Sequence, residues 1–323
     1  MRLRDRIPKG IHLKLSILLV TFNHAAYIRR ALDSILWQDL DFSFEIVVAD
    51  DASTDNTREI IAEYAGRDPR VSIRFLPESH NLGITKNYQR GFAAIDTEYV
   101  AIIEGDDIWS SPHKLSQQLA FLESHRECVL CACNYFVYLE EEARYTERVP
   151  GSDGFRYLDS RQLIADNLIG NFSTCLYRTS ALRQLPVELF DVRAYDWAVN
   201  IAVGRLGLIG FLNSPLSIYR IHGGGTWSLL SHRQKLTSQL EVIPQYDAIT
   251  GSVFREDFDA LAARLRAAGA GSGHAQAFQL RRALRWGART AVDCLPPLIA
   301  TLLRQLIPPV FKRVLIRMIG RRA

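Results

Sequence analysis

The chain has 323 residues, of which 48% are hydrophobic and 23% charged, and its formal net charge at pH 7 is +4. This length allows one large domain with appendages or two domains, and the composition is that of an ordinary globular protein. The apolar runs stay below the roughly 18 residues needed to cross a bilayer, which argues against a transmembrane protein.

The N-terminal segment lacks the features of a secretory signal. Its first apolar run, residues 11–22, is interrupted by His12 and Lys14, and no small-residue cleavage site follows. The five cysteines are an odd number without the density of a disulfide scaffold, which fits a reducing cytoplasm. Three of them lie in the apolar run 128–139, which we expect to be a buried strand, because no second ligand pair completes a zinc site.

Strands alternate with helices through the first part of the chain. The apolar runs typical of buried strands are residues 15–20, 44–49, 71–76 and 99–103. The segments with helical periodicity between them are residues 27–37, 56–64 and 85–94. This alternation predicts βαβ units and an α/β fold with a mainly parallel central sheet. The loops at 20–24, 50–55 and 104–107 should then line one crevice at the carboxyl ends of the strands.

Glu104, Asp106 and Asp107 directly follow the fourth predicted strand. Carboxylates crowded at the end of a buried strand repel one another, and a hard divalent cation would neutralise them. A solvated acidic turn before the helix near Pro112 is the alternative. No Gly-x-Gly-x-x-Gly motif follows the first strand and no Gly-Lys-Ser/Thr loop is present, which argues against a dinucleotide dehydrogenase and a P-loop ATPase.

The second half of the chain contributes further polar motifs. A helix is predicted at 114–123, residues 140–153 read as a surface hairpin or loop, and residues 171–178, 208–212 and 215–218 are strand-like. Tyr195-Asp196-Trp197 opens a helix with an apolar stripe, so this helix is entered through an acid. The glycines after His222 indicate a loop that allows close backbone approach.

Residues beyond about 231 read as helical, and residues 280–323 mix arginines with large aliphatic side chains. Proline pairs at 296–297 and 308–309 break this tail into short segments. Such segments fit helices that lie on an anionic membrane surface, and a packing surface against a partner or the domain itself is the alternative. A nucleic-acid partner is disfavoured, because no aromatic platform accompanies the arginines.

Four motifs, in this order and spacing, resemble those of the family 2 glycosyltransferases, which are inverting, use nucleoside-diphosphate sugars and have the Rossmann-like GT-A fold. The motifs are SILLVTFN at 16–23, EIVVADDASTD at 45–55, NLGITKN at 81–87 and EGDDIW at 104–109. They cover residues 13–125, and weaker motifs extend the resemblance to about residue 228. The resemblance implies a GT-A domain at residues 1–230 with helices on both faces of the sheet, followed by a helical C-terminal region at 231–323.

The resemblance also implies roles for individual residues. Its nucleotide-sugar-binding residues would be Val20, Phe22, Asn23, Asp51, Lys86, Glu104 and Arg220. Val20 and Phe22 would border a uracil or equivalent base, and Asp51 would accept a hydrogen bond from the base. Lys86 and Arg220 would lie near the diphosphate. Each has a structural alternative: Asp51 as a turn cap, Lys86 as a solvated helix charge and Phe22 as a core residue.

A divalent metal, Mn²⁺ or Mg²⁺, would be held by Asp106, with Asp107 and His222 as further candidate ligands. His222 could equally bind a phosphate oxygen or be structural. Asp196 would be the catalytic base, with Asp191 as the competing candidate and a plain N-cap as the structural alternative. Trp109, Trp197 and Trp227 could stack on an acceptor sugar or could be packing residues.

The function implied is transfer of a sugar, from a donor expected to be UDP-linked, to a glycan or lipid-linked acceptor in cell-surface polysaccharide biosynthesis. The expected place is the cytoplasm, at the inner face of the cell membrane through the tail. A catalytically inactive nucleotide-sugar-binding or scaffold protein is the alternative. A sugar-1-phosphate nucleotidyltransferase is disfavoured, because no Gly-rich, basic loop follows the first strand.

Overall fold

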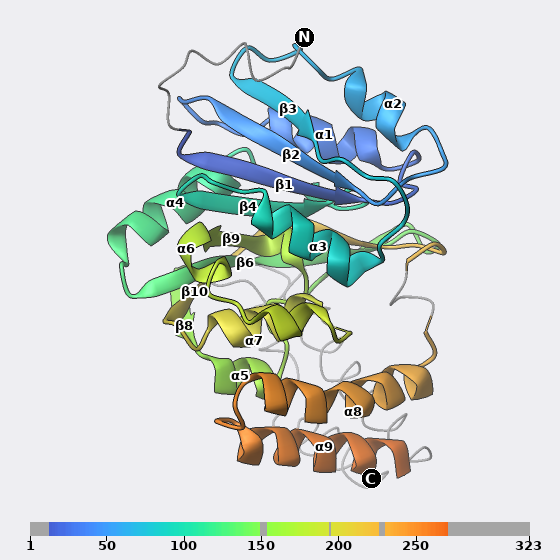
Figure 1. Ribbon diagram of the computed structural model, residues 1–323, viewed down its shortest axis with the longest axis vertical. Helices are drawn as coiled ribbons and strands as arrows, with labels where there is room; N and C mark the ends of the chain where they lie inside the picture. The colour runs from blue at the N-terminus through green and yellow to red at the C-terminus, as the bar shows by residue number, and fades with distance from the viewer. Residues whose placement is uncertain (1–12, 149–153, 194, 226–229, 271–323) are drawn as a thin grey trace, which may run out of the picture. The chain divides into compact units, whose positions relative to one another are not determined.

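The computed structural model describes residues 13–148, 154–193, 195–225 and 230–270. These residues contain a ten-stranded sheet in the order β3-β2-β1-β4-β9-β6-β10-β5, with β7 added to β6 and β8 added to β10 (Figure 1). The strands are β1 Leu15–Thr21, β2 Phe44–Asp50, β3 Val71–Phe75, β4 Tyr99–Glu104, β5 Ile108–Trp109, β6 Cys128–Leu139, β7 Arg144–Glu147, β8 Phe155–Leu158, β9 Cys175–Arg178 and β10 Leu208–Ile221.

The N-terminal half of the sheet is parallel, as the alternation of strands and helices predicted. β1 lies between β2 and β4, and all three run in the same direction. Thr21 is paired with Asp50 and Val20 with Glu104, so the three strands end side by side. Beyond β4 the sheet is mixed, because β9 runs antiparallel to both β4 and β6, while β6 and β10 are parallel.

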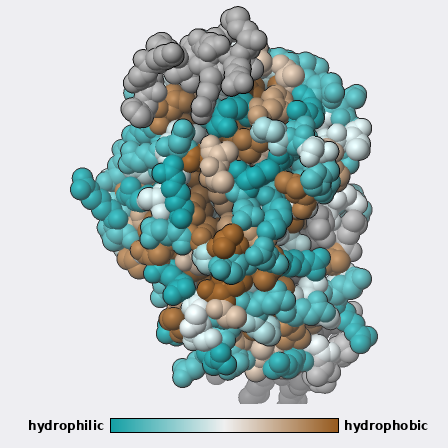
Figure 2. All heavy atoms as spheres, viewed as in Figure 1, coloured by the Kyte–Doolittle hydropathy of each residue, from teal (hydrophilic) through white to brown (hydrophobic). Residues whose placement is uncertain are grey.

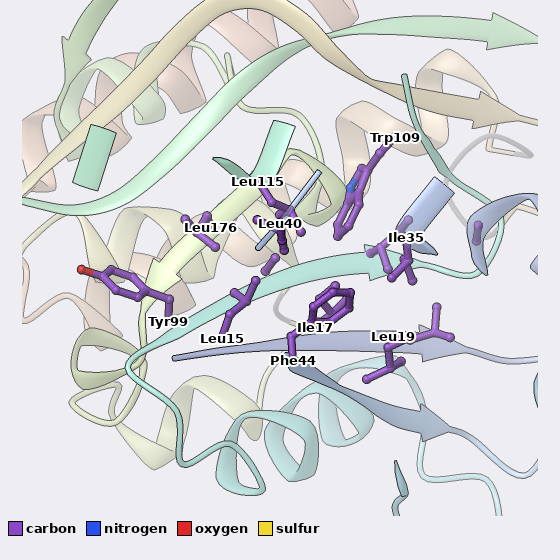
Figure 3. Packing of buried hydrophobic residues seen from close by; sticks show 14 of the residues in the cluster. Leu15, Ile17, Leu19, Ile35, Leu40, Phe44, Tyr99, Trp109, Leu115 and Leu176 are labelled. Carbon is purple, nitrogen blue, oxygen red and sulfur yellow. The ribbon is translucent and has the colours of Figure 1, made fainter. Parts of the chain in front are cut away.

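Helices cover both faces of the parallel strands. The helices are α1 Ile28–Leu36, α2 Thr57–Ala62, α3 Ile84–Ala93, α4 Lys114–Ser124, α5 Ser160–Ala165, α6 Thr179–Leu182, α7 Asp196–Val203, α8 His232–Ile249 and α9 Arg255–Ala270. Leu15, Ile17 and Leu19 point from β1 into a core with Ile35 of α1 and Leu115 of α4 (Figure 3). The opposite face packs closely against α3, where a Cβ on Gly91 would lie 2.9 Å from Leu18 Cδ1 and would require the Leu18 side chain to shift. The α/β fold class is confirmed.

Some predicted elements have different limits in the structure. The two strand-like runs at 208–212 and 215–218 form one strand, β10, which accommodates Pro215 at an irregularity in its pairing with β6. The run at 171–178 begins with a 3-10 turn, Phe172–Thr174, before β9. The turn forms because Thr174 Oγ1 donates to the Asn171 carbonyl, a local bond that competes with strand pairing.

The cysteine-bearing strand is confirmed as β6, in which Cys128, Cys131 and Cys133 are buried and free. The elements that were missed include β5, β8, α6 and α5. Of these, α5 begins with a capping box between Asp159 and Gln162. The signal for α5 is in the sequence, since an acidic cap followed three residues later by glutamine is typical of a helix start.

The chain divides into two compact units, Met1–Ala263 and Arg264–Ala323. Residues beyond 231 are helical as far as the structure describes them, in α8 and α9, and the domain boundary at 230 stays a prediction. No helix among the described residues is long and apolar enough to span a bilayer. On the face shown in Figure 2, hydrophilic residues predominate, with hydrophobic residues in patches between them. The predicted membrane-binding tail, 280–323, lies outside the described residues.

Candidate active site

The loops after β1 and β2 are tied together by hydrogen bonds through Asn23. The Asn23 N–H donates to Ser53 Oγ at 2.9 Å, and Asn23 Oδ1 accepts from the Thr54 N–H at 2.8 Å. Asn23 has φ 54°, a conformation that asparagine adopts more readily than most residues. The loop after β4 joins them, because the Gly105 N–H donates to the Val20 carbonyl at 2.9 Å. The predicted crevice edge is therefore formed, and Asn23 organises it.

The predicted base-binding residues lie at this edge. Phe22 is 42% exposed, so the alternative that it belongs to the core is wrong, whereas Val20 is buried. The Asp51 carboxylate is buried and accepts hydrogen bonds from the N–H groups of Leu82 at 2.8 Å and Gly83 at 2.9 Å. Asp51 thus fixes the turn before α3. Its contact with a base stays a prediction.

Lys86 forms an ion pair with Asp191, whose Oδ1 lies 2.6 Å from Lys86 Nζ, and both side chains are exposed. The expected roles of these residues were separate: Lys86 as a diphosphate ligand and Asp191 as the competing base. A donor diphosphate would have to compete with Asp191 for this lysine.

Glu104, at the end of β4, is partly buried and accepts a hydrogen bond from a residue outside the four motifs. The Tyr88 hydroxyl of α3 donates to Glu104 Oε1 at 2.7 Å. Burial raises the pKa of Glu104 to about 8, and the negative charge of Asp106 acts in the same direction. Glu104 therefore holds a proton more tightly than an ordinary carboxyl group.

Asp106 lies between two histidines. His222 Nε2 lies 3.0 Å and His24 Nε2 3.7 Å from Asp106 Oδ2. Burial opposes ionisation of Asp106, but the His222 hydrogen bond and the two histidines outweigh it, so its pKa is lowered. The Gly224 N–H donates to His222 Nδ1 at 3.1 Å, which leaves the ring proton on Nε2, directed at Asp106. In this tautomer His222 acts as a donor. Its role as a metal ligand stays a prediction.

Asp107 points into the protein. Its carboxylate accepts hydrogen bonds from Ser173 Oγ at 2.6 Å and from the Arg220 N–H at 3.1 Å, and burial raises its pKa well above the usual range. The Arg220 guanidinium lies between the rings of Tyr27 and Tyr138, each 5.2 Å from it, and donates to the Asp106 carbonyl at 3.1 Å. These contacts position the loop after β4. Metal binding by Asp107 and diphosphate binding by Arg220 stay predictions.

Asp196 is the first residue of α7, whose N-cap is Tyr195, so the N-cap alternative for Asp196 is wrong. Asn167 Nδ2 donates to Asp196 Oδ2 at 3.0 Å. Burial raises the pKa of Asp196 to about 6, although the Asn167 hydrogen bond and the N–H groups at the start of the helix act against this shift. The charges of both Asp106 and Asp196 act on Glu104, so carboxylates from separate parts of the chain share one site.

The tryptophans fall into different environments. Trp109 is buried, and its indole N–H donates to the Ser173 carbonyl at 2.9 Å, so it is a packing residue. Trp197 is partly buried, and its indole N–H donates to the Leu163 carbonyl at 2.7 Å. Trp227 lies outside the described residues.

The donor groups of this site suit a cation shared with a substrate better than one held by the chain alone. Among the described residues no group of three or more His, Cys, Asp or Glu side chains is arranged to hold a metal ion. Asp106 nevertheless has a lowered pKa, which favours the carboxylate form that a cation binds. Mg²⁺ and similar ions are commonly held by one or two carboxylates plus substrate phosphates. The residues present fit that arrangement.

A parallel α/β sheet with acids at its carboxyl edge and mixed strands beyond is the GT-A arrangement of glycosyltransferases, as two solved structures illustrate. S. aureus TarS 1-349 in complex with UDP-GlcNAc superposes with a TM-score of 0.60 at 20% identity, covering 78% of this chain and 71% of TarS. Mannosyltransferase PcManGT from Pyrobaculum calidifontis, in complex with GDP-Man and Mn²⁺, superposes with a TM-score of 0.54 at 17% identity. The superposition covers 94% of this chain and 92% of PcManGT. At this identity the likeness concerns the fold.

The family follows from the sequence. Residues 16–186, more than half of the chain, match the model described as Glycosyl transferase family 2, and the chain belongs to this family. An uncharacterized protein of Mycobacterium tuberculosis is 35% identical over 222 residues, which are 68% of this chain and 63% of that protein. The putative teichuronic acid biosynthesis glycosyltransferase TuaG of Bacillus subtilis is 24% identical over 208 residues, 64% of this chain and 78% of TuaG. The chain thus spans 63% of the length of the mycobacterial relative.

Proposed function

We propose that this protein is an inverting glycosyltransferase that moves a sugar from a UDP-linked donor to a glycan or lipid-linked acceptor in cell-surface polysaccharide biosynthesis. One observation carries the proposal: the carboxylate of Asp196, partly buried in the first turn of α7 and hydrogen-bonded by Asn167, acts electrostatically on Glu104 together with that of Asp106. Burial raises the pKa of Asp196 to about 6. A base is thus poised near neutral pH beside the acids of the β4 edge. Membership of family 2 and the names of TuaG and of the TarS complex support it.

In this mechanism Asp196 accepts the proton of an acceptor hydroxyl held within about 2.6–3.2 Å. The hydroxyl oxygen forms a bond to the anomeric carbon as the bond between that carbon and the diphosphate oxygen breaks, which inverts the carbon. Burial of Asp196 favours this step, since it makes the carboxylate more basic than an exposed aspartate.

The diphosphate leaves as an anion, and the site must stabilise its charge. Asp106 would hold a divalent cation, Mn²⁺ or Mg²⁺, which supplies Lewis-acid stabilisation of the diphosphate when bound. His222 and His24 flank Asp106 and would donate to phosphate oxygens or keep Asp106 in place. Phe22 and Asp51 would contact the base at the edge of β1 and β2.

The proposal is tested with Asp196→Asn and a screen of UDP- and GDP-sugars. We expect the variant to bind the donor as the wild type does, measured by thermal shift, and to lose sugar transfer roughly 10²–10⁴-fold. Unchanged transfer by Asp196→Asn and Asp106→Ala would end the enzymatic assignment. Donor binding by the wild type without any turnover would support the inactive, binding-only alternative.

The place of the protein in the cell is part of the same proposal. Residues 280–323 are rich in arginine and aliphatic side chains, a composition that suits peripheral attachment to the anionic inner face of the cell membrane. A lipid-linked acceptor would be presented at that surface.

A further inference from the structure

Asn167 is the side chain that donates a hydrogen bond to the Asp196 carboxylate, which the N–H groups of Asp196 and Trp197 also stabilise. It lies in the loop between α5 and the 172–174 turn, 29 residues before Asp196 in the sequence. Its Nδ2 donates to Asp196 Oδ2 at 3.0 Å, and its Oδ1 accepts from the Gly170 N–H at 3.1 Å. Both ends of one amide are therefore occupied, one by the proposed base and one by the backbone.

These two bonds fix the orientation of the amide. A backbone N–H can only donate, so it requires the oxygen of Asn167, and the NH₂ group must face Asp196. An NH₂ group can also only donate, so Oδ2 of Asp196 must act as an acceptor. A proton taken up by Asp196 then belongs on Oδ1.

We infer that Asn167 is a positioning residue for the proposed base: its amide, anchored on Gly170, holds Oδ2 of Asp196 and directs proton uptake to Oδ1. This inference rests on the proposed function, because it assigns Oδ1 as the atom that receives the acceptor proton. Asn167 does not touch the reacting atoms in this arrangement and acts through Asp196.

The loop around Asn167 is built to hold this position. Gly170 has φ +78°, and a Cβ there would collide with the Tyr135 hydroxyl. Arg148 pairs with Asp166 at 3.0 Å and also donates to the Asn167 carbonyl at 3.4 Å. The close approach of Gly170 to Tyr135 thus fixes the loop beside Asn167, whereas the Arg148 ion pair involves an exposed partner, Asp166.

The electrostatic surroundings make this hydrogen bond important. The ionisable groups on which the Asp196 charge acts include Tyr88 of α3, Glu104 of β4, Tyr135 of β6, Cys175 and Tyr177 of β9, Tyr219 of β10 and Tyr246 of α8. Each of these is neutral or negative, so none attracts the carboxylate as a cation would. The Asn167 bond favours the charged form, against the desolvation that opposes it.

The sharpest test is Asn167→Asp. It keeps an oxygen for the Gly170 N–H and the shape of the side chain, but it replaces the NH₂ donor with a carboxylate oxygen facing Asp196. We expect the pKa of Asp196, read from its ¹³C carboxyl resonance in the full-length protein and assigned with Asp196→Asn, to rise by roughly one unit or more. Asn167→Ala should raise it in the same direction. An unchanged pKa in both variants overturns the inference.

The matched control is Asp166→Asn, which removes the Arg148 ion pair from the same loop and leaves Asn167 in place. Its Asp196 pKa should equal that of the wild type. If Asp166→Asn shifts the pKa as much as Asn167→Ala, the loop as a whole acts, and the inference is wrong.

Turnover separates this inference from the proposed function. Release of UDP from the UDP-sugar selected by the screen should fall about tenfold or more in kcat for Asn167→Asp, with the acid limb of its pH profile moved to higher pH. Loss of turnover in Asp196→Asn with a wild-type pH profile in both Asn167 variants would leave the base in place and refute the role of Asn167. Turnover that survives Asp196→Asn would refute the base and Asn167 together.

Discussion

The surroundings of a carboxylate set its pKa, and Asp196 shows how that pKa affects the stability of the fold. Its pKa is raised from 3.8 to about 6 because it is buried, so the folded state binds its proton more tightly than the unfolded chain does. The free energy of unfolding therefore falls as pH rises from about 4 to about 6, and above that range the ionised group carries its full cost. A shift of about 2 units corresponds to about 3 kcal/mol.

Asp196→Asn should consequently stabilise the fold at neutral pH. We expect its free energy of unfolding to exceed that of the wild type by up to about 3 kcal/mol at pH 8, with the gain shrinking towards pH 5. Urea denaturation of both proteins at several pH values measures this. An equal difference at pH 5 and pH 8 would show that burial does not set the ionisation of Asp196.

Asp106 gives a second prediction for a single residue. Because its pKa is lowered, it is ionised at neutral pH and available to a cation shared with a diphosphate. UDP with Mn²⁺ should raise the melting temperature of the wild type more than UDP alone, and Asp106→Asn should lose that difference. The control is Asp33→Asn, which changes a carboxylate of α1 that accepts a hydrogen bond from the Tyr64 hydroxyl. This variant should keep the additional stabilisation by Mn²⁺.

The acids after β4 show which features of a site the sequence predicts and which it does not. The motif Glu104-Gly105-Asp106-Asp107 predicted acids at one edge, and the structure places them there. The two aspartates have different partners: Asp106 lies beside two histidines, whereas Asp107 accepts a hydrogen bond from Ser173 in the interior. Adjacent residues after a strand point in different directions, and only their partners decide which one is available to a ligand.

At the scale of elements, the loop between α5 and β9 contains a glycine whose conformation and close packing both disfavour a side chain. Gly170→Ala should destabilise the fold by roughly 2–4 kcal/mol, because alanine is strained at φ +78° and its Cβ would meet the Tyr135 ring. Gly223→Ala is the matched control, since a Cβ there has no neighbour within 4 Å. Chemical denaturation compares them, and equal stability of the two variants would contradict the close approach of Gly170 to Tyr135.

Elements with a continuous apolar run or a clear apolar face were predicted well. β1, β2, β3, β4 and α1 have nearly the predicted limits, because β1, β2 and β4 are continuous apolar runs buried on both faces and α1 has a buried apolar face. α5 and β8 were missed since each is short, and β10 was divided because Pro215 reads as a break unless a neighbouring strand accommodates it.

For the whole molecule, the prediction concerns attachment to the membrane. Removing residues 280–323 should move the protein from the membrane fraction to the soluble fraction, because the arginine-rich aliphatic tail would supply both the charge attraction and the apolar anchor. Flotation with anionic vesicles measures binding, neutral vesicles serve as the comparison, and binding should weaken at high salt. A full-length protein that stays soluble at low salt would contradict the prediction.

The sequence alone determined that strands alternate with helices, that the first four strands are parallel and that acids gather at their carboxyl edge. Local periodicity encodes those features, and the handedness of crossovers brings the strand ends together. Only the tertiary structure decided which groups meet: Asn167 with Asp196 across 29 residues, and Lys86 with Asp191 across 105. Contacts at such separations depend on how whole elements pack, which the pattern within any one element does not contain.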